Sequence, residues 1–410
     1  MTNTLFTNDN LFILCGMNSE SVDLIYIDPP FNSKRTYSAP VGSKSAGASF
    51  KDMWTWEDVN EAYLEKLTHN YPFLVRFIES IQGLHSKEMM AYITYMTQRI
   101  IEMHRILKDT GSFYLHCDPT ASHYLKVVLD YVFGKRNFRN EIIWHYRRWT
   151  GKAKIFQKLH DVILYYSKSD NRVFNVQYIE YTEGSVDRKM QGVLHRFKDG
   201  EKFLVSNKET NQEGVRGNDV WQIPFIAPSS KERTGYPTQK PLALLHRIIK
   251  ASSNEGDVVF DPFCGCATTC VAAQQLGRKW IGIDIEHQAV KVLMERLGDD
   301  AGLFSDFVNR KDIPQRTDVI IENIKDKSVK ERIFKQQNGH CNACDAEFDI
   351  WHFEVDHIVP KAKGGGDYFE NYQLLCSSCN RIKGDRPMEY LRMKIKTRDD
   401  ILRQKVVFGE

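Results

Sequence analysis

Four consecutive residues near the amino terminus have the chemistry needed to hold a flat heteroaromatic ring. Asp28, Pro29, Pro30 and Phe31 follow a run of aliphatic and aromatic residues that begins at Val22. That run is long enough for a buried strand and too short for a buried helix, and the prolines must end the strand. The Asp28 carboxylate and the Pro29 carbonyl then become fixed acceptors beside an aromatic face. They suit a ring with an exocyclic amine, such as adenine or cytosine, although an ordinary strand-ending turn is the alternative.

A glycine-containing turn and a later acid indicate a second binding site. Asp261 and Phe263 end an apolar run, and Gly265 then lets the backbone approach a ligand closely. Asp284 ends another apolar run, 19 residues after Gly265. A carboxylate at that spacing suits the ribose hydroxyls of a nucleoside, so these residues predict a nucleoside-type cofactor pocket.

Four cysteines near the carboxyl terminus have the spacing of a metal site. Cys341 and Cys344 form one Cys-x-x-Cys pair, Cys376 and Cys379 form the other, and 31 residues separate the inner cysteines. Four thiolates at this spacing can close a tetrahedral zinc site. Because protein atoms then fill all four positions, such a zinc ion is structural, and any chemistry must lie beside the cysteines.

Polar residues close to the cysteine pairs could supply that chemistry. Asp356 and His357 are adjacent and offer a carboxylate for a metal ion and a separate imidazole base. Asn371 precedes the second cysteine pair, and Asn380 directly follows it. A zinc-stabilised DNA-binding knuckle without cleavage is the alternative interpretation.

Length and composition limit the class of protein. The 410 residues predict two or three domains, and 56 Lys and Arg nearly balance 53 Asp and Glu, so any basic surface must be local. The first 17 residues lack a basic segment and do not resemble a signal peptide, and no apolar run approaches the ~20 residues of a membrane span. Metal binding explains the nine cysteines better than disulfides do. We expect a cytoplasmic protein with no membrane partner.

Alternating helix and strand patterns connect these sites. Apolar residues at helical spacing predict helices over 88–107, 122–133 and 242–251, and short apolar runs predict strands over 111–116 and 280–284. Such alternation favours an α/β fold with a parallel sheet.

One segment combines cations with aromatic residues. Residues 135–158 contain eight Lys or Arg, interleaved with aromatic residues that include Trp144, Tyr146 and Trp149. Cations bind phosphates and aromatic rings stack on bases, so the segment predicts DNA contact, with a solvated basic surface as the alternative. We place a target-recognition region at about 140–220, although no residue there indicates which bases it reads.

The Asp-Pro-Pro-Phe and Phe-Asp-Pro-Phe-x-Gly motifs resemble the catalytic and cofactor motifs of DNA amino-methyltransferases that use S-adenosylmethionine. The catalytic motif comes more than 200 residues before the cofactor motif, which is the permuted order of the β group. The resemblance covers about residues 5–300 and implies a Rossmann-like sheet with helices on both faces. It also implies that the motif from Asp28 to Phe31 holds a flipped base of double-stranded DNA at a specific site, and that a homodimer can form.

The same resemblance assigns residues to the cofactor. It implies that Asp261, Phe263 and Gly265 line the methionine end of S-adenosylmethionine, that Asp284 binds the ribose, and that Asp9 and Lys240 add further contacts. The chain has Gly-Cys-Ala where relatives usually carry Gly-Ser-Gly, and we expect binding to survive because Cys266 and Ala267 are small. An aspartate at the head of the catalytic motif favours adenine, because cytosine amino-methylation in this family more often shows serine there.

The segment from about 330 to 390 resembles an HNH endonuclease of the zinc-stabilised ββα type. The resemblance implies that Asp356 and Asn380 bind one divalent ion such as magnesium, that His357 activates the attacking water and that Asn371 orients His357. Asn380 replaces the last histidine of the family's name, which is a common variant.

Together these features predict a restriction-modification protein with two activities. Residues 1–305 form the methyltransferase domain, 306–330 a linker, 331–390 the HNH nuclease domain and 391–410 a basic tail. The alternative is a cytosine amino-methyltransferase whose zinc module only binds DNA.

Overall fold

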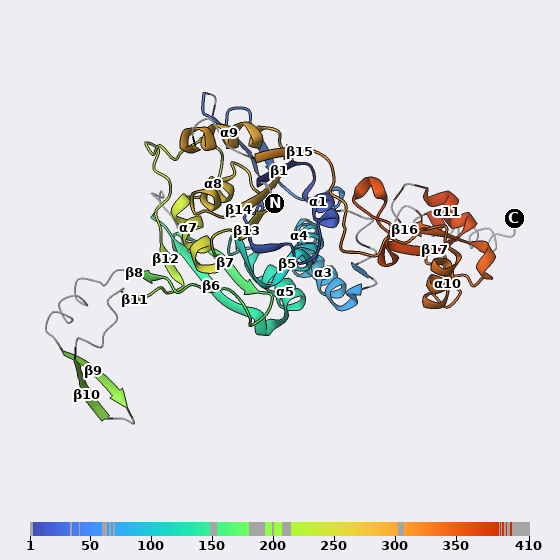
Figure 1. The fold of residues 1–410 in the computed structure, drawn as a ribbon, viewed down its shortest axis with the longest axis horizontal. Coiled ribbons are helices and arrows are strands. Elements are labelled where there is room, and N and C mark those ends of the chain that lie inside the picture. Colours follow the sequence, from blue (N-terminus) through green and yellow to red (C-terminus); the bar gives the residue numbers. More distant parts are fainter. Residues whose placement is uncertain are drawn as a thin grey trace.

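The fold is known from a computed structural model, in which a large α/β body carries a small module at one end and a two-stranded hairpin at the other (Figure 1). The structure describes residues 3–32, 35–40, 42–59, 70–147, 154–179, 193–198, 201–206, 215–301 and 307–384, and the single positions 64, 67, 68, 386, 388, 391, 394 and 395.

One nine-stranded sheet forms the centre of the large body. From edge to edge its strands are β12 (Val220–Gln222), β6 (Phe138–His145), β7 (His160–Ser167), β5 (Leu107–Cys117), β2 (Val22–Ile27), β13 (Val258–Asp261), β14 (Lys279–Asp284), β1 (Asn3–Thr7) and β15 (Phe307–Arg310). β2 and β13 are neighbours, with Ile25 opposite Phe260. The sheet therefore brings two motifs that are distant in the sequence to the same edge.

The sheet is mixed, whereas the sequence favoured a parallel one. β1, β2, β5, β13, β14 and β15 are parallel to their neighbours within this group. β7 runs antiparallel to both β5 and β6, so the expectation was wrong for this strand. The described residues between β6 and β7 contain no helix, and antiparallel strands need no helical crossover.

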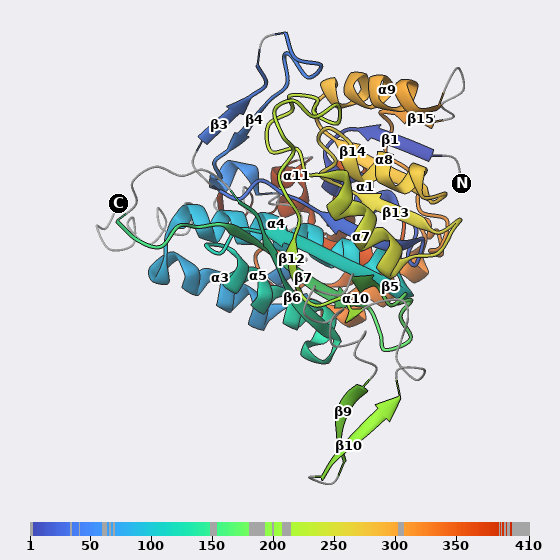
Figure 2. The same cartoon turned by 90° about the vertical axis from the view of Figure 1, so that its left-hand side faces the viewer.

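Helices cover both faces of the sheet, as the resemblance implied. α1 (Asn10–Gly16), α3 (Pro72–Leu84), α4 (Lys87–Ile106) and α5 (Ser122–Leu129) pack on one face, and α7 (Leu242–Ser252), α8 (Thr268–Gln275) and α9 (Gln288–Ala301) pack on the other (Figure 2). The alternation of side chains along β2 explains this: Ile25 and Ile27 enter the first core, while Leu24 and Tyr26 enter the second.

The segment assigned to target recognition is divided between the sheet and a projecting hairpin. Its first part forms β6 and β7. Further on, β8 (Tyr178–Ile179) pairs with β11 (Val215–Arg216), and β9 (Val193–Lys198) pairs with β10 (Glu201–Ser206). The β9–β10 hairpin stands away from the body in both views (Figures 1 and 2). Residues 180–192 and 207–214 lie outside the described part of the chain.

The small module consists of α10 (Lys327–Gln336), an antiparallel pair of β16 (Phe353–His357) and β17 (Tyr372–Cys376), and α11 (Ser377–Lys383). This strand–strand–helix order agrees with the predicted ββα module. The chain enters it through a segment that the sequence assigned entirely to a linker. That was wrong for β15, which pairs with β1 and extends the large sheet. Of the predicted tail, Leu391 is buried in the module's core, and residues 396–410 lie outside the described part.

The module packs against the large body rather than standing apart from it. Val359 joins a cluster of buried residues with Leu11, Cys15 and Ile101 of α1 and α4. Among the described residues, no helix is long and apolar enough to cross a membrane.

Candidate active sites

A cavity of about 750 Å³ opens at the carboxyl ends of the parallel strands β2, β13 and β14. The sequence predicted ten residues for base and cofactor binding, and all of them line it: Asp9, Asp28, Pro29, Pro30, Phe31, Lys240, Asp261, Phe263, Gly265 and Asp284. Parallel strands end at a common edge, so the fold gathers these five segments into one site.

The two carboxylate oxygens of Asp28 have different surroundings. Oδ2 accepts a hydrogen bond from Lys240 Nζ at 2.5 Å. Oδ1 is buried and accepts no hydrogen bond from the described residues. An unsatisfied buried acceptor costs about 1–3 kcal/mol, so a donor that enters the cavity would be stabilised there. The Phe31 ring lies close by, with the Lys240 ammonium 5.3 Å from its centroid.

Asp261 holds the turn that follows β13. Its Oδ1 accepts from the Phe263 backbone N–H at 3.0 Å, and its Oδ2 accepts from Thr269 Oγ1 at 2.5 Å. Burial raises the pKa of Asp261 to about 7, although these hydrogen bonds oppose the shift. Both oxygens therefore shape the turn that presents Phe263 and Gly265 to the cavity.

Asp284 closes the same turn from the neighbouring strand. Its oxygens accept from the backbone N–H groups of Gly265 at 2.9 Å and Glu286 at 2.8 Å, and burial raises its pKa to about 7. Gly265 has a φ of +51°, and a Cβ there would lie 3.1 Å from the Tyr236 ring. Glycine is favoured at this position both by the left-handed backbone and by the close approach of Tyr236.

Asp9 reaches the cavity from the amino-terminal end of α1. Its Oδ1 caps the helix by accepting from the Leu11 N–H at 2.8 Å, and it also accepts from Arg99 Nη2 at 3.1 Å. This charged pair joins α1 to α4 at the edge of the cavity.

Several cavity residues were not predicted. Tyr236 lies beside the Gly265 turn, and burial raises its pKa above the ordinary value. Its nearness to Lys240 in the sequence was the available signal. Trp54 follows β4 (Ser49–Asp52) and lines the cavity with a buried Nε1 that has no hydrogen-bond partner in the described part of the chain. No sequence pattern pointed to Trp54.

Residues 135–158, which were predicted to contact DNA, are only partly exposed. Trp144 is fully buried and Tyr146 is 8% exposed, so these two aromatic residues belong to the core and the prediction of base stacking was wrong for them. Trp149 lies outside the described residues. Phe156 is 99% exposed between the exposed Lys154 and Lys158, so an aromatic ring and cations of this segment do lie at the surface.

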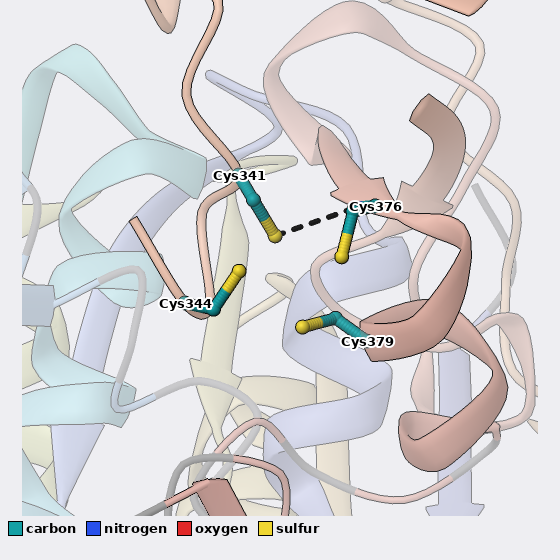
Figure 3. A group of neighbouring side chains, drawn as sticks. All are labelled: Cys341, Cys344, Cys376 and Cys379. Carbon is teal, nitrogen blue, oxygen red and sulfur yellow. Dashed lines mark hydrogen bonds between the residues drawn. The ribbon is translucent and has the colours of Figure 1, made fainter. Parts of the chain in front are cut away.

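The four predicted zinc ligands converge in the small module. The Sγ atoms of Cys341, Cys344, Cys376 and Cys379 all lie within 4.8 Å of one another and point toward a common centre (Figure 3). The Cys376 backbone N–H donates to Cys341 Sγ at 3.3 Å. Burial raises the pKa of Cys341, but such backbone hydrogen bonds outweigh it and leave the pKa below its ordinary value. Four thiols at these separations fit a tetrahedral zinc ion.

His357 lies at the end of β16, where Asp367 holds it. His357 Nε2 lies 2.9 Å from Asp367 Oδ1, and the Tyr372 hydroxyl donates to the same oxygen at 3.1 Å. Asn371 was predicted to orient His357. The structure shows that its side chain instead bonds to the backbone N–H and carbonyl of Val359, at 2.8 and 3.0 Å. Asn371 thus fixes the loop that follows His357, while Asp367, to which the sequence assigned no role, contacts the imidazole.

The two predicted ligands of a divalent ion contact different partners. Asp356 accepts from Gln373 Nε2 at 2.8 Å and pairs with the buried Lys383 at 2.9 Å. Asn380 Nδ2 donates to Glu354 at 2.5 Å. Carboxylate and amide oxygens are the donors that a hard divalent ion takes, so the residue types fit such an ion. In this structure the Lys383 ammonium supplies the positive charge beside the Asp356 carboxylate.

The central sheet, its cavity and the cysteine-stabilised module are those of a DNA methylase joined to an HNH domain, and two family comparisons agree. The DNA methylase family (N6/N4 type) matches residues 22–296, and the HNH endonuclease family matches residues 341–386. The first match spans more than half of the chain, so the chain belongs to the DNA methylase family and carries a C-terminal HNH endonuclease domain.

Similar proteins include bacterial methyltransferases. The chain is 26% identical to the type II methyltransferase M.HpaI of Haemophilus parainfluenzae, over 76% of this chain and 79% of that protein. It is 29% identical to the DNA adenine methyltransferase YhdJ of Escherichia coli K12, over 72% and 82%. Among solved structures, the cytosine-N4-specific PvuII DNA methyltransferase aligns over 73% of this chain and 88% of that chain, at 15% identity and a TM-score of 0.46. No functional conclusion follows from that structural similarity.

Proposed function

We propose that the chain is a restriction-modification protein with two activities. The methyltransferase domain transfers a methyl group from S-adenosylmethionine to the exocyclic amine of a flipped base in double-stranded DNA, at a specific site. The HNH domain cleaves DNA with a divalent ion such as magnesium, and its four cysteines hold structural zinc. We place the protein in the cytoplasm of a prokaryotic or phage-infected cell, where DNA is its partner.

The observation that carries the methyltransferase proposal is Asp28 Oδ1, which has no hydrogen-bond partner among the described residues. It is a buried acceptor, and the cavity that Asp28 lines is also lined by the Gly265 turn. An aromatic amine is a poor nucleophile because its lone pair is delocalised into the ring. Hydrogen bonds from its two N–H groups to Asp28 Oδ1 and the Pro29 carbonyl would tilt the nitrogen toward a tetrahedral geometry and free the lone pair.

The left-handed turn at Gly265 supports S-adenosylmethionine as the cofactor. The turn brings backbone close to the cavity beside the acid Asp284, and this arrangement fits the methionine and ribose ends of that molecule. Bound there, the cofactor supplies the methyl group as an electrophilic sulfonium. The chain's own residues fix the base, stack on it through Phe31 and exclude water.

Adenine is the favoured base, and cytosine is the second candidate. The aspartate that heads the catalytic motif supports adenine, and the printed name of one relative, YhdJ, says that it is a DNA adenine methyltransferase. Single-molecule mapping of modified bases in DNA from cells that express the chain would decide between N6-methyladenine and N4-methylcytosine. The same experiment identifies the recognition sequence, and the absence of any modified site would overturn the proposal.

The pairing of His357 with Asp367 supports a nuclease over a passive DNA clamp. A carboxylate that holds an imidazole increases its ability to take a proton from water. Plasmid cleavage with magnesium should be lost in His357→Ala and retained in His352→Ala, which changes an exposed histidine of the same module. Cleavage that survives His357→Ala would overturn the nuclease assignment. Comparison of methylated and unmethylated plasmids then shows whether the mark blocks cleavage or is required for it.

Removal of residues 330–410 separates a nuclease from a clamp. Loss of a nuclease leaves methylation largely intact, because the described residues that line the methyltransferase cavity run from Asn8 to Glu286. Loss of a clamp instead weakens DNA binding and methylation together.

A further inference from the structure

A buried histidine lies behind the catalytic motif. His116 of β5 is fully buried and is not among the residues that line the cavity. Its Nδ1 lies 2.9 Å from the Tyr26 hydroxyl and 4.0 Å from Asp28 Oδ1, and its Nε2 lies 3.2 Å from Asp161 Oδ2. The Asp28 oxygen that faces His116 is therefore the one without a hydrogen-bond partner in the described part of the chain.

The neighbours of His116 determine how its ring is protonated. Burial raises the pKa of Asp161, but hydrogen bonds from His116 and Tyr146, together with the charge of Lys240, outweigh it and leave the pKa below its ordinary value. An ionised Asp161 is an acceptor only, so His116 Nε2 carries a proton and donates it. Burial raises the pKa of Tyr26 far above its ordinary value, and the phenol stays a donor. In the neutral ring the lone pair of Nδ1 thus faces Tyr26 and Asp28.

Methyl transfer creates a proton that this arrangement can receive. When the amine nitrogen forms its bond to the methyl carbon, the nitrogen becomes cationic and one of its N–H groups becomes acidic. Asp28 Oδ1 is the nearest acceptor, while Oδ2 of the same carboxylate is already held by the Lys240 ammonium. A second acceptor beside Oδ1 would complete the reaction.

We propose that His116 accepts the proton of the methylated amine through Asp28 Oδ1, and that Asp161 positions its ring and stabilises the resulting imidazolium. The proposal rests on the amine methylation proposed above. One N–H bond of the methylated amine breaks and Asp28 Oδ1 takes the proton. The Tyr26 hydroxyl then turns its proton away from His116 Nδ1, Oδ1 closes the 4.0 Å gap, and Nδ1 takes the proton from Oδ1. The products are a neutral methylamine, an ionised Asp28 and a protonated His116. Asp161, whose side chain is 16% exposed, gives a path for the proton to solvent.

Aromatic rings and charged groups surround His116. The rings of Phe31 and Trp144 pack at centroid distances of 5.8 and 5.4 Å and exclude water. The titratable and charged groups that face the histidine directly or through these partners are Tyr26, Asp28, Asp161, Tyr146 and Lys240.

The first test follows His116 in the full chain without cofactor or DNA. The ring Cε1–H signal of His116 is identified by its absence in His116→Gln and titrated by NMR. In Asp161→Asn the midpoint should fall by about one pH unit, because a stabilising negative charge is lost. An unchanged midpoint in Asp161→Asn would overturn the positioning role of Asp161.

The second test is the pH dependence of single-turnover methyl transfer. The parent should lose rate as pH falls and His116 takes up a proton. Gln at position 116 can still donate to Asp161 but cannot accept a proton, so His116→Gln should be about tenfold slower near pH 8 and lack this acidic limb. Asp161→Asn keeps the histidine and can be used if His116→Gln fails to fold. In Asp161→Asn the acidic limb should move to lower pH. An unchanged profile in both variants would overturn the proposal.

A matched control separates a specific effect from the general loss of a buried histidine. His104 lies on α4 with its ring 4.8 Å from that of Phe133, outside the cavity. His104→Gln should keep the parent rate and acidic limb. A parent that methylates no DNA at any pH contradicts the proposed function, whereas a methylating parent with an unaltered His116→Gln profile contradicts only the role of His116.

Discussion

The methyltransferase cavity and the HNH module both place an acid beside a base, but they are held together in different ways. The cavity joins segments between Asn8 and Glu286, and two cores on a nine-stranded sheet fix their positions. The module places Asp356, His357 and Asp367 within a dozen residues, on a two-stranded sheet with a much smaller core. A large core can position distant residues by itself, whereas a small one needs covalent or metal cross-links.

The largest expected effect is the loss of the module when its zinc site is broken. Cys376→Ser removes one of four thiolates, and structural zinc contributes on the order of 10 kcal/mol to the folding of small metal-stabilised domains. DNA cleavage should disappear while methylation continues, and zinc content measured by emission spectrometry should fall. Cys270→Ser, at a buried cysteine of α8 outside the cluster, should keep zinc and cleavage. Loss of methylation in Cys376→Ser would show that the two regions fold together.

Removal of the Asp28 carboxylate should affect the methyltransferase domain alone. Asp28→Ala deletes the acceptor for the amine and should slow methyl transfer by at least ~10²-fold, as the loss of a preorganised partner commonly does. Cleavage should be unchanged, and calorimetry should show cofactor binding close to that of the parent. Asp28→Asn keeps one acceptor oxygen and should be less impaired. Methyl transfer at the parent rate in Asp28→Ala would remove the basis for the proposed chemistry.

A smaller effect is expected when the Gly265 turn is altered. Gly265→Ala forces a side chain into a left-handed conformation and toward Tyr236, which costs about 1–2 kcal/mol. The cofactor dissociation constant from calorimetry should rise by roughly tenfold. Gly256→Ala is the matched control, because its φ is +83° but nothing lies within 4 Å of the added Cβ. Equal weakening in both variants would mean that backbone strain matters and the contact with Tyr236 does not.

The cofactor end of the cavity should also make the large body less stable as pH rises from acidic to neutral values. Asp261 and Asp284 have folded pKa values of about 7, above the ordinary value of 3.8, so the folded state binds their protons more tightly than the unfolded state. Their contribution to stability is present at low pH and is lost as pH rises through 7. His104, whose pKa burial lowers to about 4, acts in the opposite sense below 6.5.

The unfolding temperature is therefore measured at pH 6.5 and at pH 8. Among these three groups, Asp261 and Asp284 change the stability most over this interval. The unfolding temperature of the large body should fall by a few degrees over this interval and fall less in Asp284→Asn. The unfolding temperature of the small module should have the same pH dependence in the parent and in Asp284→Asn. A parent and a variant with equal pH dependence would contradict the raised pKa of Asp284.

The smallest expected effect concerns DNA affinity. Phe156 is 99% exposed between two lysines, and stacking of one base on an aromatic ring is worth about 1–3 kcal/mol. Phe156→Ala should raise the dissociation constant for duplex DNA by roughly fivefold in fluorescence anisotropy. Phe73→Ala, at a 69% exposed aromatic residue of α3, should leave it unchanged. Equal affinities in the parent and Phe156→Ala would exclude this segment from the interface.

Prediction from the sequence succeeded where a short pattern carries its own geometry. Prolines after an apolar run mark the end of a strand, and this placed Asp28 correctly at the end of β2. The spacing of the cysteine pairs likewise predicted a cluster of four thiols. The prediction of exposed aromatic rings failed for Trp144 and Tyr146. Their burial depends on which strands flank β6, and no local signal in the sequence indicates that β7 lies between β5 and β6.

By itself the sequence determined the types of residue and the ends of the elements that carry them: the acid and aromatic ring after β2, the glycine turn after β13 and the paired cysteines. Only the tertiary structure decided which partners these groups meet. Lys240 binds Asp28 from 212 residues away, His116 approaches its free oxygen from β5, and Asp367 holds His357. Local patterns follow from backbone geometry and side-chain size, whereas contacts between distant groups depend on how the whole sheet and its cores pack.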